Sequence, residues 1–392
     1  MFLDVIMRRN DALLDAAVAL HQSGSIPAGS YVVDLEAVRE NASAIAREGR
    51  RLGLSVFAMT KQFGRNPDVC AAIRAGGIPA SVAVDLTCAI ATHRAGMQVG
   101  HIGHLVQIPT HATAAAARLE PGYWTVFGDE HAASAAAAAR ELGRDQPLLA
   151  RVYDDGDTFY RGHEGGYRAS AIVEVAERLD AMPGALFRGL TTFPAMLFDP
   201  TTRTVAPTHN LRTLERAAAA LSAVGRRVEV NAPGTTSAVT LPALAAAGAT
   251  QVEPGHALTG TTPLHAVEDL AERPAMCFVT EVSHTHAGRA YCFGGGLYVD
   301  PVFPPYRVRA YVACEPGAGR LVDAELPDAG AIDYYAQLEA ADLAVGTTVI
   351  FGFRAQTFVT RAPTIGIDGV ASGAPVPRGA YRPDGSPLGE VD

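Results

Sequence analysis

Short apolar runs alternate with longer, alanine-rich stretches between about residues 30 and 262. Each run has the length of a buried strand, and most of the stretches between the runs show the apolar spacing of a helix. This alternation predicts βα units, which assemble into a parallel sheet. The eight runs are residues 55–59, 80–84, 103–108, 123–127, 148–153, 187–193, 227–231 and 250–254.

Eight βα units are the number that closes a (β/α)8 barrel of the TIM type, which takes about 250 residues. An open, doubly wound sheet is the alternative, but it usually carries a glycine-rich phosphate turn after its first strand. Residues 58–66, Ala-Met-Thr-Lys-Gln-Phe-Gly-Arg-Asn, do not form such a turn. We therefore predict an α/β fold with a closed barrel over residues 30–264.

The pattern changes after about residue 265, where apolar and polar residues alternate and the turns are rich in Gly and Pro. Alternation with a period of two is typical of antiparallel strands with one buried face. We therefore predict a β-rich, antiparallel C-terminal domain over residues 265–392. Residues 1–29 are expected to form a helix that packs on this second domain.

Composition and charge exclude several classes of function. The net charge is −9 and there is no basic run, which is a poor basis for nucleic-acid binding. No apolar run approaches the roughly 18 residues of a membrane span, and the N-terminal basic pair follows the apolar residues, the reverse of a signal peptide. The five cysteines form no Cys-x-x-Cys pair, which indicates reduced thiols. These features predict a cytoplasmic protein that binds neither nucleic acid nor membrane.

One residue count is informative about chemistry. Of the 32 Lys and Arg residues, only Lys61 is a lysine. Arg can replace Lys in solvation and ion pairing, but a guanidinium stays protonated and forms no imine. An amine can be desolvated and made nucleophilic. The one position that retains lysine is therefore a candidate for chemistry that needs an amine, and a chance surface lysine is the alternative.

Polar residues gather where the predicted strands end, which is where the active site of a βα barrel forms. Lys61 lies beyond the first run, separated from it by one residue. The loops 231–237 and 254–256 follow the last two runs, and their small hydroxyl side chains and open backbone amides suit a phosphate. Ordinary tight turns are the alternative for both loops. The other strand ends carry Asp85, Gln107, residues 154–157, Thr191 and Thr192.

Several of these segments carry a family resemblance. Residues 31–41, with 57–61 after them, look like the opening helix and lysine strand of the alanine-racemase-like family, the type III fold of pyridoxal 5'-phosphate (PLP) enzymes. Residues 82–96, 189–193 and 252–260 are similar to its second, sixth and eighth βα segments. The resemblance covers about residues 30–262, continues weakly to about 365, and is closest to the YhfX branch.

The resemblance implies PLP held as a Schiff base on Lys61. Arg161 matches, loosely, the Arg that contacts the phenolic oxygen, and Thr192 falls where the family stacks a His on the ring. Glu253 replaces the Arg of alanine racemases, and a carboxylate there keeps a proton on the pyridine nitrogen, which makes a stronger electron sink. An ion pair with an Arg is the alternative for Glu253. The residues implied in holding the cofactor beside these are Asn231, Thr235, Thr236, Ser237, Gly255 and His256.

Racemisation needs a second acid or base on the face of the cofactor opposite the lysine. Phe293 occupies the nearest position to the family's Tyr and cannot move a proton. Its neighbours Cys292 and Tyr291 can, and Cys292 is preferred because an unperturbed thiol is the more acidic. A buried structural thiol is the alternative. Arg354 is the candidate for the substrate carboxylate.

His284 and His286 alternate on one strand face, but no third ligand accompanies them, so no metal is predicted.

The resemblance favours a PLP-dependent amino-acid racemase or epimerase. A decarboxylase, aldolase or dehydratase is the first alternative, because the same electron sink serves each. A non-catalytic PLP-binding homeostasis protein is the second, although such proteins end with the barrel and this chain continues. The family also implies a homodimer in which the β domain of one subunit covers the barrel mouth of the other.

Overall fold

The computed structural model describes residues 1–328 and 330–389. The chain divides into two compact units. One unit combines Ser43–Thr60 with Gly77–Gly255, and the other combines Met1–Ala42, Lys61–Gly76 and His256–Asp392. We call them the barrel unit and the β unit, and each is described by itself.

The barrel unit is built on a parallel sheet in the order β2-β13-β12-β9-β7-β6-β5-β4-β3. β2 pairs with β13 and β3 pairs with β4, and only Phe57 separates β2 from β3. The two halves of the first strand therefore close the sheet on itself, so the predicted (β/α)8 barrel is confirmed. The strands are β2 (Ser55–Val56), β3 (Ala58–Met59), β4 (Ala80–Ala83), β5 (Gln98–Ile102), β6 (Tyr123–Val126), β7 (Gln146–Tyr153), β9 (Ala185–Thr191), β12 (Glu229–Asn231) and β13 (Gln251–Val252).

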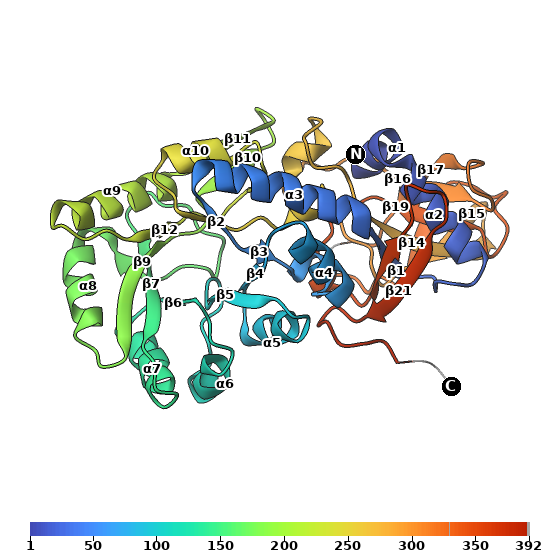
Figure 1. The fold of residues 1–392 in the computed structure, drawn as a ribbon. Helices are drawn as coiled ribbons and strands as arrows, with labels where there is room; N and C mark the ends of the chain where they lie inside the picture. Colours follow the sequence, from blue (N-terminus) through green and yellow to red (C-terminus); the bar gives the residue numbers. More distant parts are fainter. Residues whose placement is uncertain (329, 390–392) are drawn as a thin grey trace. The chain divides into compact units, whose positions relative to one another are not determined.

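Helices lie around the outside of these strands (Figure 1). In α7 the residues turned inward are alanines, whose small side chains allow a close approach to the sheet. The carboxylate of Asp85 caps α5 by accepting a hydrogen bond from the backbone N–H of Cys88 at 2.6 Å. This residue at the end of a strand therefore has a structural role. The helices are α5 (Leu86–Arg94), α6 (Thr113–Ala117), α7 (Asp129–Arg140), α8 (Ile172–Asp180), α9 (His209–Ala223) and α10 (Leu241–Ala246), and α3 (Leu35–Leu52) precedes the first strand.

The prediction for the third strand is wrong. Residues 103–108 form a loop, and the strand is β5, which ends at Ile102. β5 contains Gly100 and His101, which gave it a weak apolar pattern. A Cβ at Gly100 would lie 2.6 Å from the Phe57 ring, so the close packing there requires glycine. His101 is fully buried because its ring is hydrogen-bonded on both sides. The structure also contains β8 (Tyr167–Arg168), β10 (Met196–Asp199) and β11 (Thr204–Pro207).

The β unit is a nine-stranded sheet in the order β15-β18-β17-β16-β19-β14-β1-β20-β21. β14 also pairs with β15, so the first six strands close into a ring, and the pairings are antiparallel except for β1 with β20. The predicted antiparallel β domain is therefore confirmed. The strands are β1 (Ser30–Asp34), β14 (Met276–His286), β15 (Arg289–Phe293), β16 (Val308–Ala313), β17 (Arg320–Glu325), β18 (Tyr335–Leu338), β19 (Thr348–Phe351), β20 (Thr364–Asp368) and β21 (Val376–Tyr381).

The N-terminal residues form two helices, α1 (Phe2–Arg9) and α2 (Asp11–Gln22), where the sequence predicted one. Leu13 and Val18 of α2 belong to one apolar cluster with Val279 and Ile350 of the sheet. The β unit also contains α4 (Pro67–Ala75) and the short 3-10 turns η1 (Lys61–Phe63), η4 (His256–Thr259), η5 (Pro263–Ala266) and η6 (Thr357–Val359).

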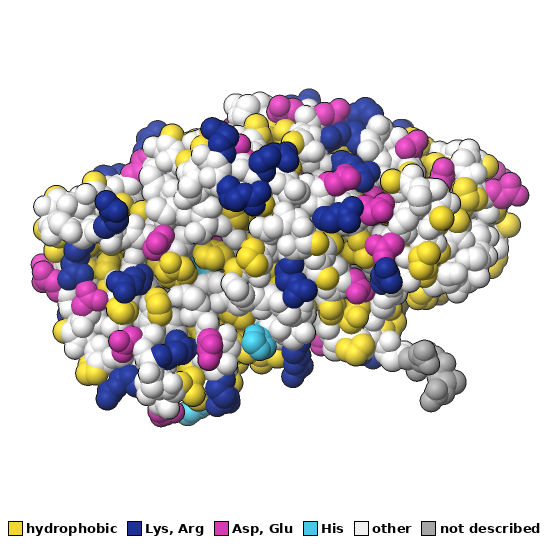
Figure 2. Space-filling view, in the orientation of Figure 1, with side chains coloured by type: hydrophobic (Ala, Val, Ile, Leu, Met, Phe, Trp, Pro, Cys, Tyr) yellow, Lys and Arg dark blue, Asp and Glu magenta, His cyan; other side chains and the backbone are white. Residues whose placement is uncertain are grey.

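Charged side chains of both signs are interspersed over the face drawn in Figure 2. None of the described helices combines the length and the apolar character that crossing a bilayer requires.

Candidate functional site

Glu253 lies directly after β13, and its carboxylate is buried. Oε1 of Glu253 lies 2.6 Å from Nδ1 of His101 and accepts a hydrogen bond from the amide of Asn231 at 2.9 Å. Oε2 lies 3.3 Å from Nε2 of His104. Burial alone would raise the pKa of Glu253, but the imidazoles of His104 and His101 and the two hydrogen bonds hold it below its usual range. The side chain is therefore a buried carboxylate ion, and the groups that stabilise it among the described residues are His101, His104 and Asn231, none of them an arginine.

The loop from 231 to 237 follows β12. Gly234 has no room for a side chain, since a Cβ would lie 2.6 Å from the carbonyl oxygen of Met196. The hydroxyl of Ser237 is buried and has no hydrogen-bond partner among the described residues, and the hydroxyl of Thr192 after β9 is in the same condition. Buried hydroxyls without partners are costly unless a ligand completes their hydrogen bonds.

The other predicted residues of this loop have internal partners. The backbone N–H of Thr235 donates to the carbonyl of Met196 at 3.0 Å. The buried Thr236 hydroxyl donates to the carbonyl of Gly234 at 3.4 Å. The amide of Asn231 donates to Glu253, and its Oδ1 accepts from Thr191, so Asn231 holds Glu253 in place and is not left for a phosphate.

Arg161, the predicted partner of the phenolic oxygen, is exposed in the loop after β7. Arg151, inside β7, is instead 1% exposed, with Nε and one terminal nitrogen lacking hydrogen-bond partners among the described residues. Its other terminal nitrogen donates to the carbonyl of His163 at 2.6 Å, and its guanidinium lies 4.7 Å from the ring centre of Phe127. Burial lowers the pKa of Arg151 to about 10, so it is still a cation near neutral pH. The position of Arg161 therefore argues against its predicted role, and Arg151 is the buried cation that suits an anionic ligand group.

Lys61 is the first residue of η1 in the β unit, and a peptide bond joins it to Thr60 at the end of the first barrel strand. Its Nζ lies 5.0 Å from the ring centre of Phe358. The hydroxyl of Thr357 donates to the carbonyl of Gln62 at 2.8 Å, which fixes η6 against η1. The only lysine of the chain is thus held on an ordered turn beside an aromatic ring.

His256 and Arg354 belong to the same unit. His256 and the preceding Gly255 are buried, and burial together with the charges of Arg354 and Lys61 lowers the pKa of His256 well below its usual range. His256 is therefore neutral, and its Nε2 has no hydrogen-bond partner among the described residues. Arg354 forms an ion pair with the buried Asp300. Its charge is already balanced, which weakens the prediction that it holds a substrate carboxylate.

Cys292 is fully buried on β15, in register with Val282 on β14 and Ala336 on β18. Burial raises the pKa of its thiol to about 12. A protonated, inaccessible thiol is poorly suited to proton transfer, so this position favours the structural alternative for Cys292. Tyr291 is half-buried, and its ring stacks on His284 with the centroids 4.6 Å apart.

His284 and His286 are exposed. Among the described residues, the group that could ligate a metal is His101, His104 and Glu253.

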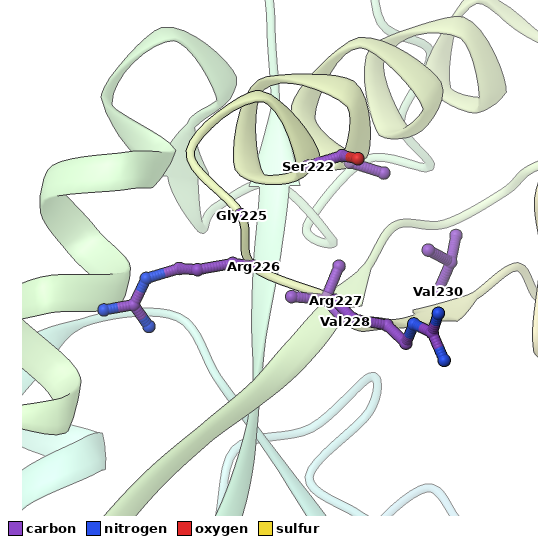
Figure 3. A pocket seen from close by; sticks show the side chains of 7 residues that line it. Ser222, Gly225, Arg226, Arg227, Val228 and Val230 are labelled. Carbon is purple, nitrogen blue, oxygen red and sulfur yellow. The ribbon is translucent and has the colours of Figure 1, made fainter.

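A pocket of about 370 Å³ opens elsewhere in the barrel unit, between the end of α9 and the start of β12 (Figure 3). Arg226 and Arg227 extend away from one another there, and Arg226 pairs with Asp180 at 2.6 Å. Its lining includes Val230 of β12 but none of Asn231, Glu253, His101 and His104. It is therefore separate from the cluster around Glu253.

Comparisons with known proteins bear on these features. Residues 33–263 match the family "Alanine racemase, N-terminal domain", and residues 277–376 match "YhfX-like, C-terminal domain". The chain is 38% identical to the protein "Uncharacterized protein YhfX" of Escherichia coli (strain K12), over 99% of this chain and 100% of the relative. This chain belongs to the alanine-racemase-like family, in its YhfX branch. The predicted family is confirmed, and members of this family bind pyridoxal phosphate.

Solved structures share the fold at low sequence identity. D-threonine aldolase from Filomicrobium marinum superimposes with a TM-score of 0.65 at 17% identity, covering 91% of this chain and 95% of its own. D-threo-3-hydroxyaspartate dehydratase from Delftia sp. HT23 gives 0.65 at 19%, covering 91% and 98%. An alanine racemase of Clostridium difficile 630 in complex with cycloserine gives 0.63 at 15%, covering 90% and 98%. The three names include an aldolase, a dehydratase and a racemase, so the fold does not select the reaction.

Proposed function

We propose that this chain is a PLP-dependent amino-acid racemase or epimerase in which Lys61 carries the cofactor and Glu253 faces its ring nitrogen. The observation that carries the proposal is the buried Glu253 carboxylate, kept ionised by His101, His104 and Asn231. An ionised carboxylate in a dry site favours a protonated pyridine nitrogen. When bound, a protonated PLP supplies an electron sink for the pair left on Cα after proton removal.

The buried polar atoms of the barrel unit fit the other parts of the cofactor. The hydroxyls of Ser237 and Thr192 and two nitrogens of Arg151 lack partners among the described residues. A phosphate and a phenolic oxygen are acceptors that satisfy such donors. We assign the phenolic oxygen to Arg151 in place of Arg161, and we retain Ser237 for the phosphate. His256 is neutral, and its Nε2 has no hydrogen-bond partner among the described residues, so it can serve as an N–H donor.

With the cofactor bound, the amine of Lys61 would be the base that takes the Cα proton from its own side. A racemase also needs an acid on the opposite side. Of the two candidates from the sequence, Tyr291 retains an accessible phenol, whereas Cys292 is buried. We therefore assign the opposite-face acid to Tyr291.

A homodimer is part of this proposal, because the β domain of the partner then brings Tyr291 to the barrel mouth. Sedimentation velocity should show a dimer. Chains carrying Lys61→Ala and Tyr291→Phe should each be nearly inactive alone, and mixed dimers should recover activity, because one of their two sites has both groups. Tyr335→Phe, in the same aromatic cluster, is the matched control and should retain activity. Mixed dimers that stay inactive would contradict the shared site.

A lyase that eliminates a β-substituent or cleaves the Cα–Cβ bond is the second candidate. The solved structures that share the fold include an aldolase and a dehydratase, which supports it, and these reactions do not require an acid on the opposite face. Incubation of the holo-protein with a panel of D- and L-amino acids in D₂O separates the two. Deuterium at Cα with both enantiomers present supports the racemase, whereas a keto acid or an aldehyde supports the lyase. Neither Cα exchange nor a keto acid or aldehyde product with any of the amino acids would contradict both.

A further inference from the structure

We propose that Arg354 and Gln356 form the subsite for the substrate side chain and select an amino acid whose side chain carries a neutral hydroxyl group. The inference rests on the proposed function, because it takes Lys61 as the residue that carries the cofactor. It adds to that function the class of amino acid that binds beside the lysine.

Arg354 and Gln356 lie on one short segment of the β unit, between β19 and η6. Their neighbours Phe353, Ala355 and Thr357 are buried, whereas Arg354 and Gln356 are half-buried. Burial that alternates with a period of two is typical of an extended chain, in which every second side chain points the same way. The guanidinium and the amide are therefore turned to the same side of the segment.

This segment lies next to the turn that begins with Lys61. It leads directly into η6, which is fixed to η1 by a hydrogen bond of 2.8 Å. The ring centre of Phe358 on η6 lies 5.0 Å from Nζ of Lys61. The charges of Arg354 and Lys61 both act on His256, so all three side chains lie in one region of the β unit. A substrate amine that meets Lys61 therefore brings its side chain near this segment.

The charges of the subsite balance. Arg354 forms an ion pair with Asp300, whose side chain is only 4% exposed. Tyr298 lies beside the ion pair and beside Gln356. Burial and the charge of Asp300 raise the pKa of Tyr298, whereas the charge of Arg354 and a hydrogen bond from Gln356 lower it in part. The phenol is therefore neutral near pH 7. A charged substrate side chain would find no uncompensated opposite charge there, and its desolvation would not be offset.

Two polar atoms of the subsite still need partners. Nε of Arg354 and Oε1 of Gln356 are buried and have no hydrogen-bond partner among the described residues. The first is a donor and the second is an acceptor. A hydroxyl group accepts and donates, so it suits both atoms. A carboxylate suits only the donor, an ammonium group suits only the acceptor, and a methyl group suits neither. The subsite is therefore complementary to a hydroxylated side chain.

The test measures binding by the holo-protein. Amino acids of nearly the same shape are compared in pairs, threonine with valine and serine with 2-aminobutyrate, each as both enantiomers. Binding is followed by the change that the amino acid causes in the visible absorbance of bound PLP, recorded before product accumulates. The hydroxylated member of each pair should bind roughly 10- to 100-fold more tightly, because its analogue leaves a buried donor and a buried acceptor unpaired. Aspartate and lysine should bind more weakly than threonine and serine.

Substitutions locate this preference on the two residues. Gln356→Met removes the acceptor at similar side-chain length, and it should lose most of the preference while binding valine as the wild type does. Arg354→Met alone would leave the Asp300 carboxylate buried without its partner, so it is combined with Asp300→Asn. The double variant should lose the preference as well, and Gln356→Met tests the proposal if the double variant does not fold. Gln22→Met, exposed on α2, is the matched control and should keep the preference.

Each contrary result has a distinct meaning. An absorbance that responds to no amino acid of the panel contradicts the proposed function, and the inference falls with it. Equal affinities within each pair overturn the hydroxyl subsite alone, because binding beside Lys61 is then still observed. Tighter binding of aspartate or lysine than of threonine and serine overturns the neutral character of the subsite. A preference that is undiminished in Gln356→Met and in the double variant overturns the assignment to Arg354 and Gln356.

Discussion

Substitution of Arg151 by Met should separate the stability of the apo-protein from its affinity for PLP. Burial lowers the pKa of Arg151 to about 10, whereas an ordinary guanidinium titrates above about 12. A difference of this size corresponds to roughly 3 kcal/mol of unfavourable free energy for the buried cation. One hydrogen bond to His163 and ring contacts with Phe127 and Phe159, at about 1–2 kcal/mol each, are together at least as large as this cost.

The apo-protein of Arg151→Met should therefore lose little stability, within about 1–2 kcal/mol of the wild type, although a fully buried residue has been replaced. Affinity for PLP should fall by roughly 10- to 150-fold, since a charged hydrogen bond is worth about 1.5–3 kcal/mol. Urea unfolding of the apo-protein measures the first quantity, and a fluorescence titration with PLP measures the second.

The exposed Arg161 supplies the control, because Arg161→Met should change neither quantity by more than about 0.5 kcal/mol. If Arg151→Met binds PLP as tightly as the wild type while Arg161→Met does not, the original assignment from the sequence is right and the reasoning from burial is refuted.

Two further predictions concern the lysine and the cysteines. Lys61→Ala and Lys61→Arg should both lose the visible absorbance of lysine-bound cofactor and the covalent fixation of that cofactor by borohydride, because neither side chain is a nucleophilic amine. Lys61→Arg should keep the thermal unfolding temperature of the wild type. Fixation that persists in either variant would refute the assignment of Lys61. Native protein should expose one thiol per chain to Ellman's reagent at mildly alkaline pH, because Cys314 is exposed and the other four cysteines are buried. Unfolded protein should expose all five thiols. Rapid reaction of Cys292 in the native protein, located by mass spectrometry, would contradict its raised pKa and its burial.

The fold could be predicted from the sequence because the buried strands of the barrel appear in it as apolar runs. Seven of the eight predicted runs overlap a barrel strand. The third run missed β5, whose Gly100 and His101 serve close packing and hydrogen bonding. A buried polar residue within a strand was also missed in the prediction of the site. Arg151 lies inside the apolar run 148–153, where it was taken as part of a strand, and a lone charge within such a run is the signal that could have found it.

Long-range partners explain the other differences. The ionisation of Glu253 depends on His101, which is 152 residues away in the chain. A local sequence pattern cannot show that two such distant residues are in contact. Cys292 lies next to Tyr291 in sequence, but alternation along β15 turns the two side chains to opposite faces, one into the core and one outward. Family resemblance located this strand correctly but did not show which of its faces is buried.

The discontinuity of the β unit has a consequence for synthesis on the ribosome. The barrel unit contains no residue beyond Gly255, so all of its strands have been synthesised while the last third of the chain is still being made. The β unit takes Lys61–Gly76 from between two segments of the barrel unit and pairs Tyr31 of β1 with Thr364 of β20. The segment that begins with Lys61 therefore waits for the end of translation before its supports exist, and truncation before β20 should release a nascent chain with a formed barrel and an unanchored lysine.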